Sequence, residues 1–250
     1  MRTSADPMMM APGYFDRAGD AICRIAGART EAEAVLLLRH AARYIGADVA
    51  MFCSLVHDQP LELRFMLACD PQWYLEYERS VFPSHDPWIT YAAGCGEPAC
   101  ASQIPVSSPS QARALELARR FGFESTLVVP SPSIGAAGRL GLLVLGSPSQ
   151  GFFERDSGTA IRVMARSLSM ELNAWRLSQS RRELIHRAQL TATDIDLLRR
   201  ERKGHGTKEI ARQICMTAQA IDSRFQRLNA RLGVPSRKAA ASLAASYGLV

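Results

Sequence analysis

The feature that most constrains the fold of this chain is a run of helix signals in residues 190–250. Thr191 and Asp194 form a variant of the capping box, in which each side chain can bind the other residue's backbone N–H. Further caps and stops follow at short intervals, at Gly204, Thr207, Thr217, Gly233 and Ser236. The pattern predicts four short helices.

The third of these helices is predicted to be amphipathic. One stripe is apolar, with Ile221, Phe225, Leu228 and Leu232. The opposite side is polar, with Gln219, Asp222, Ser223, Gln226 and Arg227. Two short helices joined by a tight turn, the second with a polar face, are the geometry that places a helix in the major groove of DNA. A small helical bundle that only contacts proteins would show the same periodicity, so periodicity leaves both functions open.

Positive charge is concentrated in the same region. The chain has a net charge of +6, and from Ser180 onward it has 14 Lys and Arg against 6 Asp and Glu. A basic module attached to a nearly neutral domain suits phosphate binding, because phosphate contacts supply most of the nonspecific affinity for DNA. Composition alone is equally consistent with a solvated basic face.

The preceding residues alternate helix and strand signals. Strand patterns lie at 49–56, 61–69, 125–129 and 139–145, and helix patterns at 14–25, 30–45, 71–81, 86–93, 111–121 and 152–176. The strands come in hairpin-like pairs, which favours antiparallel pairing. The sequence therefore predicts an α+β fold: an α/β/α sandwich with a mainly antiparallel sheet, followed by an all-α four-helix helix-turn-helix domain.

A polar, charged segment at 177–189 is predicted to be the linker between a first domain, residues 1–176, and a second, residues 190–250. The chain has no nucleophile elbow, P-loop, zinc-protease motif or paired catalytic carboxylates, which argues against an enzyme. Its six cysteines form no C-x-x-C pair, so we expect neither a metal nor a cofactor. Without an export signal or a run of about 20 apolar residues, a cytoplasmic protein is expected.

The C-terminal residues carry a resemblance to a known family. It rests on Leu190, Thr191, Gly204, Glu209–Ala211, Ile221, Arg231–Val234, Ser236, Arg237, Ala239, Gly248 and Leu249. These residues resemble the C-terminal signature of the LuxR family of bacterial regulators. The chain departs from that signature at Asp194, Ala220 and Arg224, where the family often has Glu, Thr and His.

The resemblance implies that residues 190–250 form a LuxR-type helix-turn-helix and that residues 218–232 form its recognition helix. Asp222 and Gln226 are then the candidates for base reading, because Gln can pair with adenine and Asp can accept from cytosine N4. The candidates for phosphate contacts are Lys208, Arg212, Arg224, Arg227, Arg237 and Lys238. Thr217, Gln219 and Ser223 complete the predicted DNA-binding set. Arg231 is equally well explained as a structural ion-pair partner.

A second resemblance covers roughly residues 15–175. Trp73, Tyr77, Asp86 and Pro87, with Pro98 further on, are spaced as in the acyl-homoserine-lactone-binding domain of quorum-sensing LuxR regulators. The resemblance implies that Asp86 accepts the ligand amide N–H, Trp73 donates to the lactone carbonyl and Tyr77 contacts the acyl part. Taken alone, the residues admit other roles: Trp73 and Tyr77 could be core, and Asp86 could cap a helix.

Several pocket positions depart from that pattern. Cys69, Ala101, Thr126 and Val144 stand where Tyr, Trp, Gly and Ser or Thr are common. The polar inventory is reduced and one wall is opened, while Trp88 and Tyr91 could refill the volume. A lost hydrogen bond to a buried carbonyl costs ~1–3 kcal/mol, so we expect an altered ligand preference. The chain could then be an orphan, or solo, member that lacks its own signal synthase.

The two resemblances together imply a homodimeric, DNA-binding transcriptional regulator controlled by a small diffusible signal. The expected signal is an acyl-homoserine lactone or a related amide. The expected partners are partly palindromic double-stranded promoter DNA and, for an activator, RNA polymerase, with no membrane. The alternative is a ligand-independent LuxR-type regulator whose N-terminal domain only dimerises.

Overall fold

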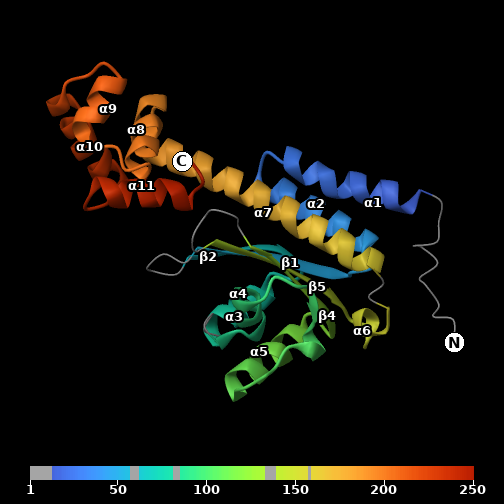
Figure 1. Ribbon diagram of the computed structural model, residues 1–250. Helices are drawn as coiled ribbons and strands as arrows, with labels where there is room; N and C mark the ends of the chain where they lie inside the picture. Colours follow the sequence, from blue (N-terminus) through green and yellow to red (C-terminus); the bar gives the residue numbers. More distant parts are fainter. Residues whose placement is uncertain (1–12, 57–61, 81–84, 133–138, 157–158) are drawn as a thin grey trace. The chain divides into compact units, whose positions relative to one another are not determined.

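The computed structural model describes residues 13–56, 62–80, 85–132, 139–156 and 159–250 (Figure 1). The described residues divide into two compact units, one up to Trp175 and the other from Arg176 to Val250. The first unit contains all the strands of the described residues, and the second is helical.

A five-stranded sheet forms the middle of the first unit, in the order β2-β1-β5-β4-β3, and every neighbouring pair is antiparallel. Its strands are β1 (Val49–Val56), β2 (Glu62–Ala68), β3 (Ala99–Cys100), β4 (Ser125–Pro132) and β5 (Arg139–Ser147). The sequence predicted four of these strands. It missed β3 because two residues are too few to show an alternating pattern.

Helices cover both faces of this sheet (Figure 1). On one face lie α1 (Tyr14–Cys23), α2 (Glu31–Tyr44) and the first part of α7 (Thr159–Arg187). On the other face lie α3 (Gln72–Ser80), α4 (Pro87–Gly94) and α5 (Pro109–Arg120). The short elements are the 3-10 turns η1 (Arg24–Gly27) and η3 (Ala101–Gln103), and the helix α6 (Phe152–Asp156).

Two separate cores result from the alternation of side chains along the strands. In β5, Leu143 and Leu145 pack against α1, α2 and α7, whereas Leu142 and Val144 pack toward α3, α4 and α5. All four side chains are buried. Because successive strand residues point to opposite faces, a strand that is apolar at every position must be covered on both sides. The predicted α/β/α sandwich is confirmed.

The helix predicted for residues 152–176 is two helices in the structure, α6 and α7. The second continues to Arg187, through most of the segment predicted to be a linker. Leu184, inside that segment, is buried in the core of the second unit, as is Ala188, which follows the helix. Their neighbours Arg182 and Glu183 are exposed, so the polar composition reflects the outer face of a helix and not an irregular linker.

The second unit contains α8 (Ala192–Arg202), α9 (Thr207–Gln213), α10 (Ala218–Leu232) and α11 (Arg237–Ser246). The side chains of Thr191, Thr217 and Ser236 cap α8, α10 and α11 as predicted. The helix predicted after Gly204 is present as α9, but its predicted cap was wrong, because the N-cap is Gly206 and Thr207 is the first helical residue. The core includes Ile210, Ile221, Phe225 and Leu228, which confirms the apolar stripe of α10.

None of the helices in the described part of the chain combines the length and apolarity that a membrane crossing requires.

Candidate functional site

A buried carboxylate marks the start of α4. Asp86 is the N-cap of this helix, and its Oδ1 accepts the backbone N–H groups of Trp88 at 2.8 Å and Ile89 at 3.1 Å. Its Oδ2 accepts the hydroxyl of Tyr77 at 2.9 Å. The Asp-Pro pair explains the local structure, because Pro87 occupies the first helical position, where no N–H is needed. Asp86 therefore has the capping role that its sequence allowed.

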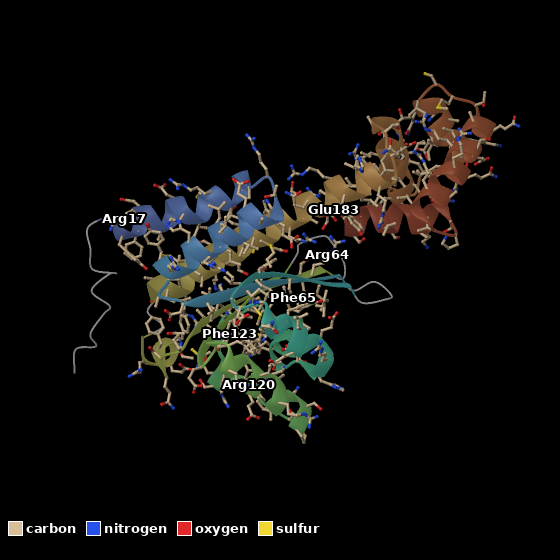
Figure 2. The ribbon with its side chains drawn as sticks, turned by 180° about the vertical axis from the view of Figure 1, so that it is seen from behind. Arg17, Arg64, Phe65, Arg120, Phe123 and Glu183 are labelled. Atoms are coloured by element: carbon tan, nitrogen blue, oxygen red, sulfur yellow. The ribbon has the colours of Figure 1, made fainter. Side chains whose placement is uncertain are left out.

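Two aromatic side chains of α3 cover this carboxylate. Trp73 and Tyr77 lie one turn apart, and their rings are stacked with centroids 4.8 Å apart. Phe65 of β2 meets each of them edge-on at 5.7 Å. In Figure 2, Phe65 and Phe123 both lie on the side of the sheet that α3, α4 and α5 cover.

Burial controls the charges of this cluster. It raises the pKa of Asp86, while the hydrogen bonds from Ile89, Tyr77 and Trp88 oppose the shift. Burial and then the Asp86 charge raise the pKa of Tyr77, so Tyr77 remains a hydrogen-bond donor at neutral pH. The pKa of Cys53, in β1, is raised for the same two reasons, in the same order. Asp86 Oδ2 accepts the Tyr77 hydroxyl and has a second lone pair, which an amide N–H could fill.

Two indole N–H groups of this unit are buried without a hydrogen-bond partner in the described protein, those of Trp73 and Trp88. Such a donor costs ~1–3 kcal/mol when it stays unsatisfied. The third tryptophan of the chain, Trp175, lies on the other face of the sheet and donates its indole N–H to the carbonyl of Ala28 at 2.8 Å. A ligand with acceptor oxygens would satisfy the two donors that the fold leaves unpaired.

A pocket of about 200 Å³ meets this cluster at Trp88, and of the other predicted ligand residues Ala101 alone lines it. Its apolar lining consists of Trp88, Ala101, Ile104, Val106, Leu115 and Phe123. Four exposed polar residues also border it: Ser102, Arg119, Glu124 and Glu154. Ala101 leaves room for the pocket, because a large side chain in its place would extend into this volume.

The structure brings most of the predicted ligand residues together. Trp73, Tyr77, Trp88 and Val144 belong to one buried cluster, and Ala101 packs against it. Tyr91 packs there as well, but its hydroxyl donates to the carbonyl of Glu97 at 2.8 Å.

The remaining predicted positions are buried beside this cluster. Thr126 is fully buried, and its hydroxyl donates to the carbonyl of Phe123 at 2.9 Å. Cys69 belongs to the same core, and burial raises the pKa of its thiol to about 11. Sequence reasoning missed Phe65 and Phe123. The sequence did contain a pattern that could have identified Phe65. It alternates with residues 63 and 67, which places its side chain on the face of β2 that packs toward α3.

The second unit presents the predicted DNA-binding residues on α9, α10 and α11. Asp222 and Gln226 are exposed one turn apart on α10, and Asp222 Oδ1 accepts the Thr207 hydroxyl at 3.2 Å. Six others are exposed: Lys208, Arg212, Thr217, Gln219, Arg227 and Lys238. Ser223, Arg224 and Arg237 are partly buried.

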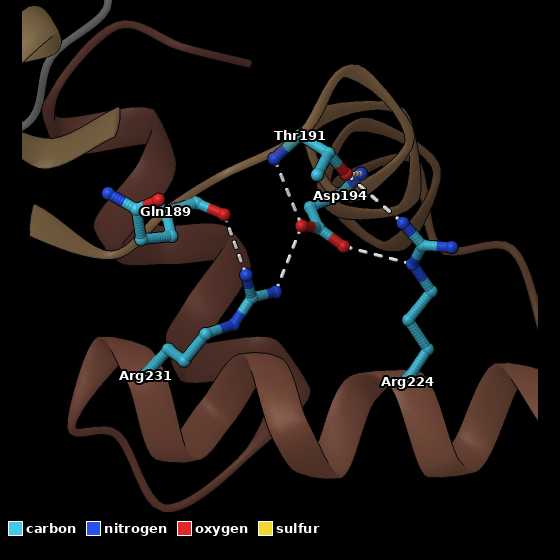
Figure 3. Close-up of polar contacts among 5 residues, drawn as sticks. All are labelled: Gln189, Thr191, Asp194, Arg224 and Arg231. Atoms are coloured by element: carbon cyan, nitrogen blue, oxygen red, sulfur yellow. Dashed lines mark hydrogen bonds and ion pairs between the residues drawn. The ribbon is translucent and has the colours of Figure 1, made fainter. Parts of the chain in front are cut away.

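Asp194 organises the contact between α8 and α10 (Figure 3). Its carboxylate accepts the backbone N–H of Thr191 at 3.0 Å, Arg224 Nε at 2.9 Å and Arg231 Nη2 at 2.9 Å. Burial raises its pKa, but these three donors outweigh burial and hold the pKa at about 2. Arg231 is thus an ion-pair partner, as the sequence suggested.

Arg224 and Arg237 have partners within the unit that the sequence did not indicate. Arg224 also donates to the Thr191 hydroxyl at 3.1 Å. Arg237 donates to the Thr207 hydroxyl at 2.7 Å and lies 3.2 Å from Glu201 Oε2. A phosphate contact by either guanidinium would have to use its remaining N–H groups, so Lys208, Arg227 and Lys238 are the less constrained cations.

Comparison with solved structures places this fold among known ones. SdiA of Escherichia coli is similar with a TM-score of 0.70 at 15% sequence identity, covering 94% of this chain and 98% of that one. SdiA in complex with octanoyl-rac-glycerol gives a TM-score of 0.66 at 15% identity, covering 96% and 98% of the two chains. At these identities, the likeness shows the fold alone, and it confirms the predicted fold class.

CepR2 of Burkholderia cenocepacia, described as an N-acylhomoserine lactone dependent LuxR family transcription factor, gives a TM-score of 0.53 at 19% identity. That alignment covers 65% of this chain and 93% of CepR2. No curated protein sequence matches the chain. Residues 30–172 match the family described as the autoinducer binding domain, a segment that makes up more than half of the chain and includes Trp73, Tyr77 and Asp86. The chain therefore belongs to the family of proteins with an autoinducer-binding domain.

Proposed function

We propose that this protein is a DNA-binding transcriptional regulator controlled by a small diffusible signal. The observation that carries the proposal is the combination, in one chain, of an autoinducer-binding domain with a basic four-helix unit that exposes Asp222 and Gln226 on one helix. This role requires no catalytic group. It fits the cytoplasm, where both the signal and the DNA are accessible.

The signal we propose combines an amide-bearing head group with an apolar chain, as in an acyl-homoserine lactone or a related amide. Asp86 can accept the amide N–H, Trp73 can donate to a head-group carbonyl, and the pocket beside Trp88 can take the chain. Two of the similar solved structures support this type of ligand: CepR2 depends on an N-acylhomoserine lactone, and one SdiA structure holds octanoyl-rac-glycerol. Ala101 and Val144 favour a preference that differs from the common one, as in an orphan member without its own synthase.

For DNA, we propose that α10 enters the major groove as the recognition helix. Asp222 and Gln226 would read base edges, with Thr217, Gln219 and Ser223 near them. Lys208, Arg227 and Lys238 would contact phosphates, assisted by the free N–H groups of Arg224 and Arg237. A homodimer would present two such helices to a partly palindromic promoter site, with half-sites about one helical turn apart, and would contact RNA polymerase if it activates.

The domain organisation we propose follows the predicted boundaries. Residues 1–176 would sense the signal and dimerise, residues 190–250 would bind DNA, and residues 177–189 would connect the two. Ligand binding to the first domain would then shift the population of DNA-competent dimers.

The test is a reporter gene behind a promoter that the protein binds, in a host that makes only this regulator. We expect culture extract of the native organism to change expression, and Asp86→Asn to abolish that response. The substitution keeps the size of the side chain but gives the cap an NH₂ group where Tyr77 and the signal need an acceptor. The matched control is Asp70→Asn, an exposed residue before α3.

The competing function is a regulator that binds DNA without a ligand and uses its first domain only to dimerise. The bonds of Asp86 to Tyr77 and to the first turn of α4 favour it, because they give the carboxylate a purely structural use. An extract response that survives Asp86→Asn, in protein that stays soluble, would rule against Asp86 as the signal anchor. Expression that never depends on extract would support the ligand-independent function.

A further inference from the structure

Trp88 contacts both the Asp86 carboxylate and the pocket of the first unit. Its backbone N–H binds Asp86 Oδ1 at 2.8 Å, in the first turn of α4. Its ring borders the pocket together with Ala101 and is tilted against Phe123, with centroids 6.1 Å apart. The side chain therefore lies at the boundary between the carboxylate that would hold a head group and the volume that would hold a chain.

The indole N–H of Trp88 has no hydrogen-bond partner among the described residues, although the residue is only 4% exposed. Packing alone does not account for this choice of side chain. A phenylalanine would fill an apolar wall without bringing in a buried donor, and buried donors are otherwise almost always paired. Trp175, which is also buried, shows that the same fold pairs an indole N–H when the protein supplies the acceptor.

We propose that Trp88 determines ligand specificity by donating its indole N–H to an acceptor oxygen on the part of the signal's chain next to its head group. The proposal rests on the proposed function, because it concerns the same pocket. Trp73, whose N–H is also unpaired, would serve the lactone carbonyl, and Trp88 is assigned to the chain because it borders the pocket that would hold the chain. A chain with a carbonyl or hydroxyl close to the amide belongs to this class, whereas a plain saturated chain does not.

Two probes that differ by one oxygen test this directly: N-octanoyl-homoserine lactone and N-(3-oxooctanoyl)-homoserine lactone. Calorimetric titration of the full chain should show about tenfold tighter binding of the oxo compound, which is the net effect of one hydrogen bond. In Trp88→Phe the two affinities should become equal. The matched control Trp73→Phe should weaken both probes and keep their ratio, and the melting temperature of each variant checks its folding.

The indole region of a ¹H–¹⁵N spectrum gives a second readout that needs no stable variant. The chain has three tryptophans, so three indole signals are expected. The Trp88 signal should shift more with the oxo probe than with the plain one, and the Trp175 signal should stay in place with both, because its N–H remains bound to Ala28.

Equal affinities in the unmodified protein, or a ratio that survives Trp88→Phe, would overturn the role of Trp88 while leaving a lactone-type signal in place. Failure of both probes to bind would overturn this inference and the proposed class of signal together, and would leave DNA binding to be judged by its own test.

Discussion

Asp194 is a carboxylate that a small helical unit can bury only if donors surround it. Its side chain is 2% exposed, and it receives two guanidinium groups and one backbone N–H. Removing one of these arginines leaves the buried carboxylate with fewer donors, which costs more than the pair itself contributes. Asp194 therefore fixes α10 against α8, and the position of the predicted recognition helix depends on it.

This arrangement predicts a pH dependence. The pKa of Asp194 is about 2 in the folded chain against an ordinary value of 3.8, so its contribution is present above pH 3.8 and is lost as the pH falls toward 2. The shift corresponds to about 2 kcal/mol. In urea unfolding, Asp194→Asn should be less stable than the unmodified protein at pH 6, and the difference should shrink toward pH 2. Asp196→Asn, which removes a half-exposed partner of Arg200, should cost under about 1 kcal/mol at every pH. A gap between Asp194→Asn and the unmodified protein that does not change with pH would contradict the assignment.

At the scale of single residues, the sequence indicated which side chains have a role better than it indicated which residues they contact. Asp86 could be predicted as a cap from the Asp-Pro pair, and the same residue is the proposed anchor of the signal. The partners of Arg224 could not be predicted, because its bond to Asp194 joins residues 30 positions apart. The pairing of Trp175 with Ala28, and hence the contrast with Trp88, also depends on contacts that only the fold creates.

Local sequence patterns determine where the helices and strands of the first unit form. Which side chains come into close contact depends on how the strands pair in the sheet. Gly146 in β5 shows this: a Cβ at its position would lie 2.5 Å from Phe123 and 2.8 Å from Val49. The backbone of β5 approaches these side chains only because the residue is glycine. Gly19, inside α1, has nothing within 4 Å of a built Cβ and has no such reason to be glycine.

Opposite effects are therefore expected for the same substitution at these two positions. Gly146→Ala should lower the free energy of unfolding by ~1–3 kcal/mol through overpacking against Phe123. Gly19→Ala should raise it by ~0.5–1 kcal/mol, because alanine is the better helix former. Thermal and urea unfolding of the full chain measure both. A stabilising Gly146→Ala would mean that β5 and Phe123 are not in contact.

Helix α7 shows why an element boundary was wrong in the sequence analysis. The polar residues of 177–189 were interpreted as a linker, since composition does not show which face of a helix is buried. In the structure, Arg181 Nε donates to the carbonyl of Tyr247 at 2.9 Å, and Leu184 lies in the core of the second unit. Most of the predicted linker is thus part of that unit.

Truncation of Leu184 tests this placement. Leu184→Ala should destabilise the second unit by ~2–5 kcal/mol, as expected for a buried leucine. Hydrogen exchange should show faster exchange of the α8 and α10 amides and unchanged protection of the strands. Arg182→Ala, at the exposed position two residues earlier, should leave both units unchanged. Equal exchange rates in the two variants would mean that Leu184 does not pack in the core of the second unit.

At the scale of the whole molecule, the chain separates two kinds of chemistry. The first unit has a buried carboxylate, two indole donors without a partner among the described residues and a pocket beside Trp88, and the second has exposed basic residues around the polar face of α10. Charge and periodicity indicated the basic helical module, whereas the ligand-binding residues were indicated only by the resemblance to the acyl-homoserine-lactone-binding domain. The identity of the signal stays outside the reach of the sequence, because a pocket's volume and unpaired groups arise from side chains on several elements.

The most direct test of the account is a DNA footprint of the purified full chain on promoter fragments, with and without extract of the native culture. We expect a protected, partly palindromic segment whose protection changes with extract. Replacement of Asp222 and Gln226 by alanine should abolish the specific footprint, while the far-UV circular dichroism stays unchanged. A chain that protects no segment under any of these conditions would contradict the central claim.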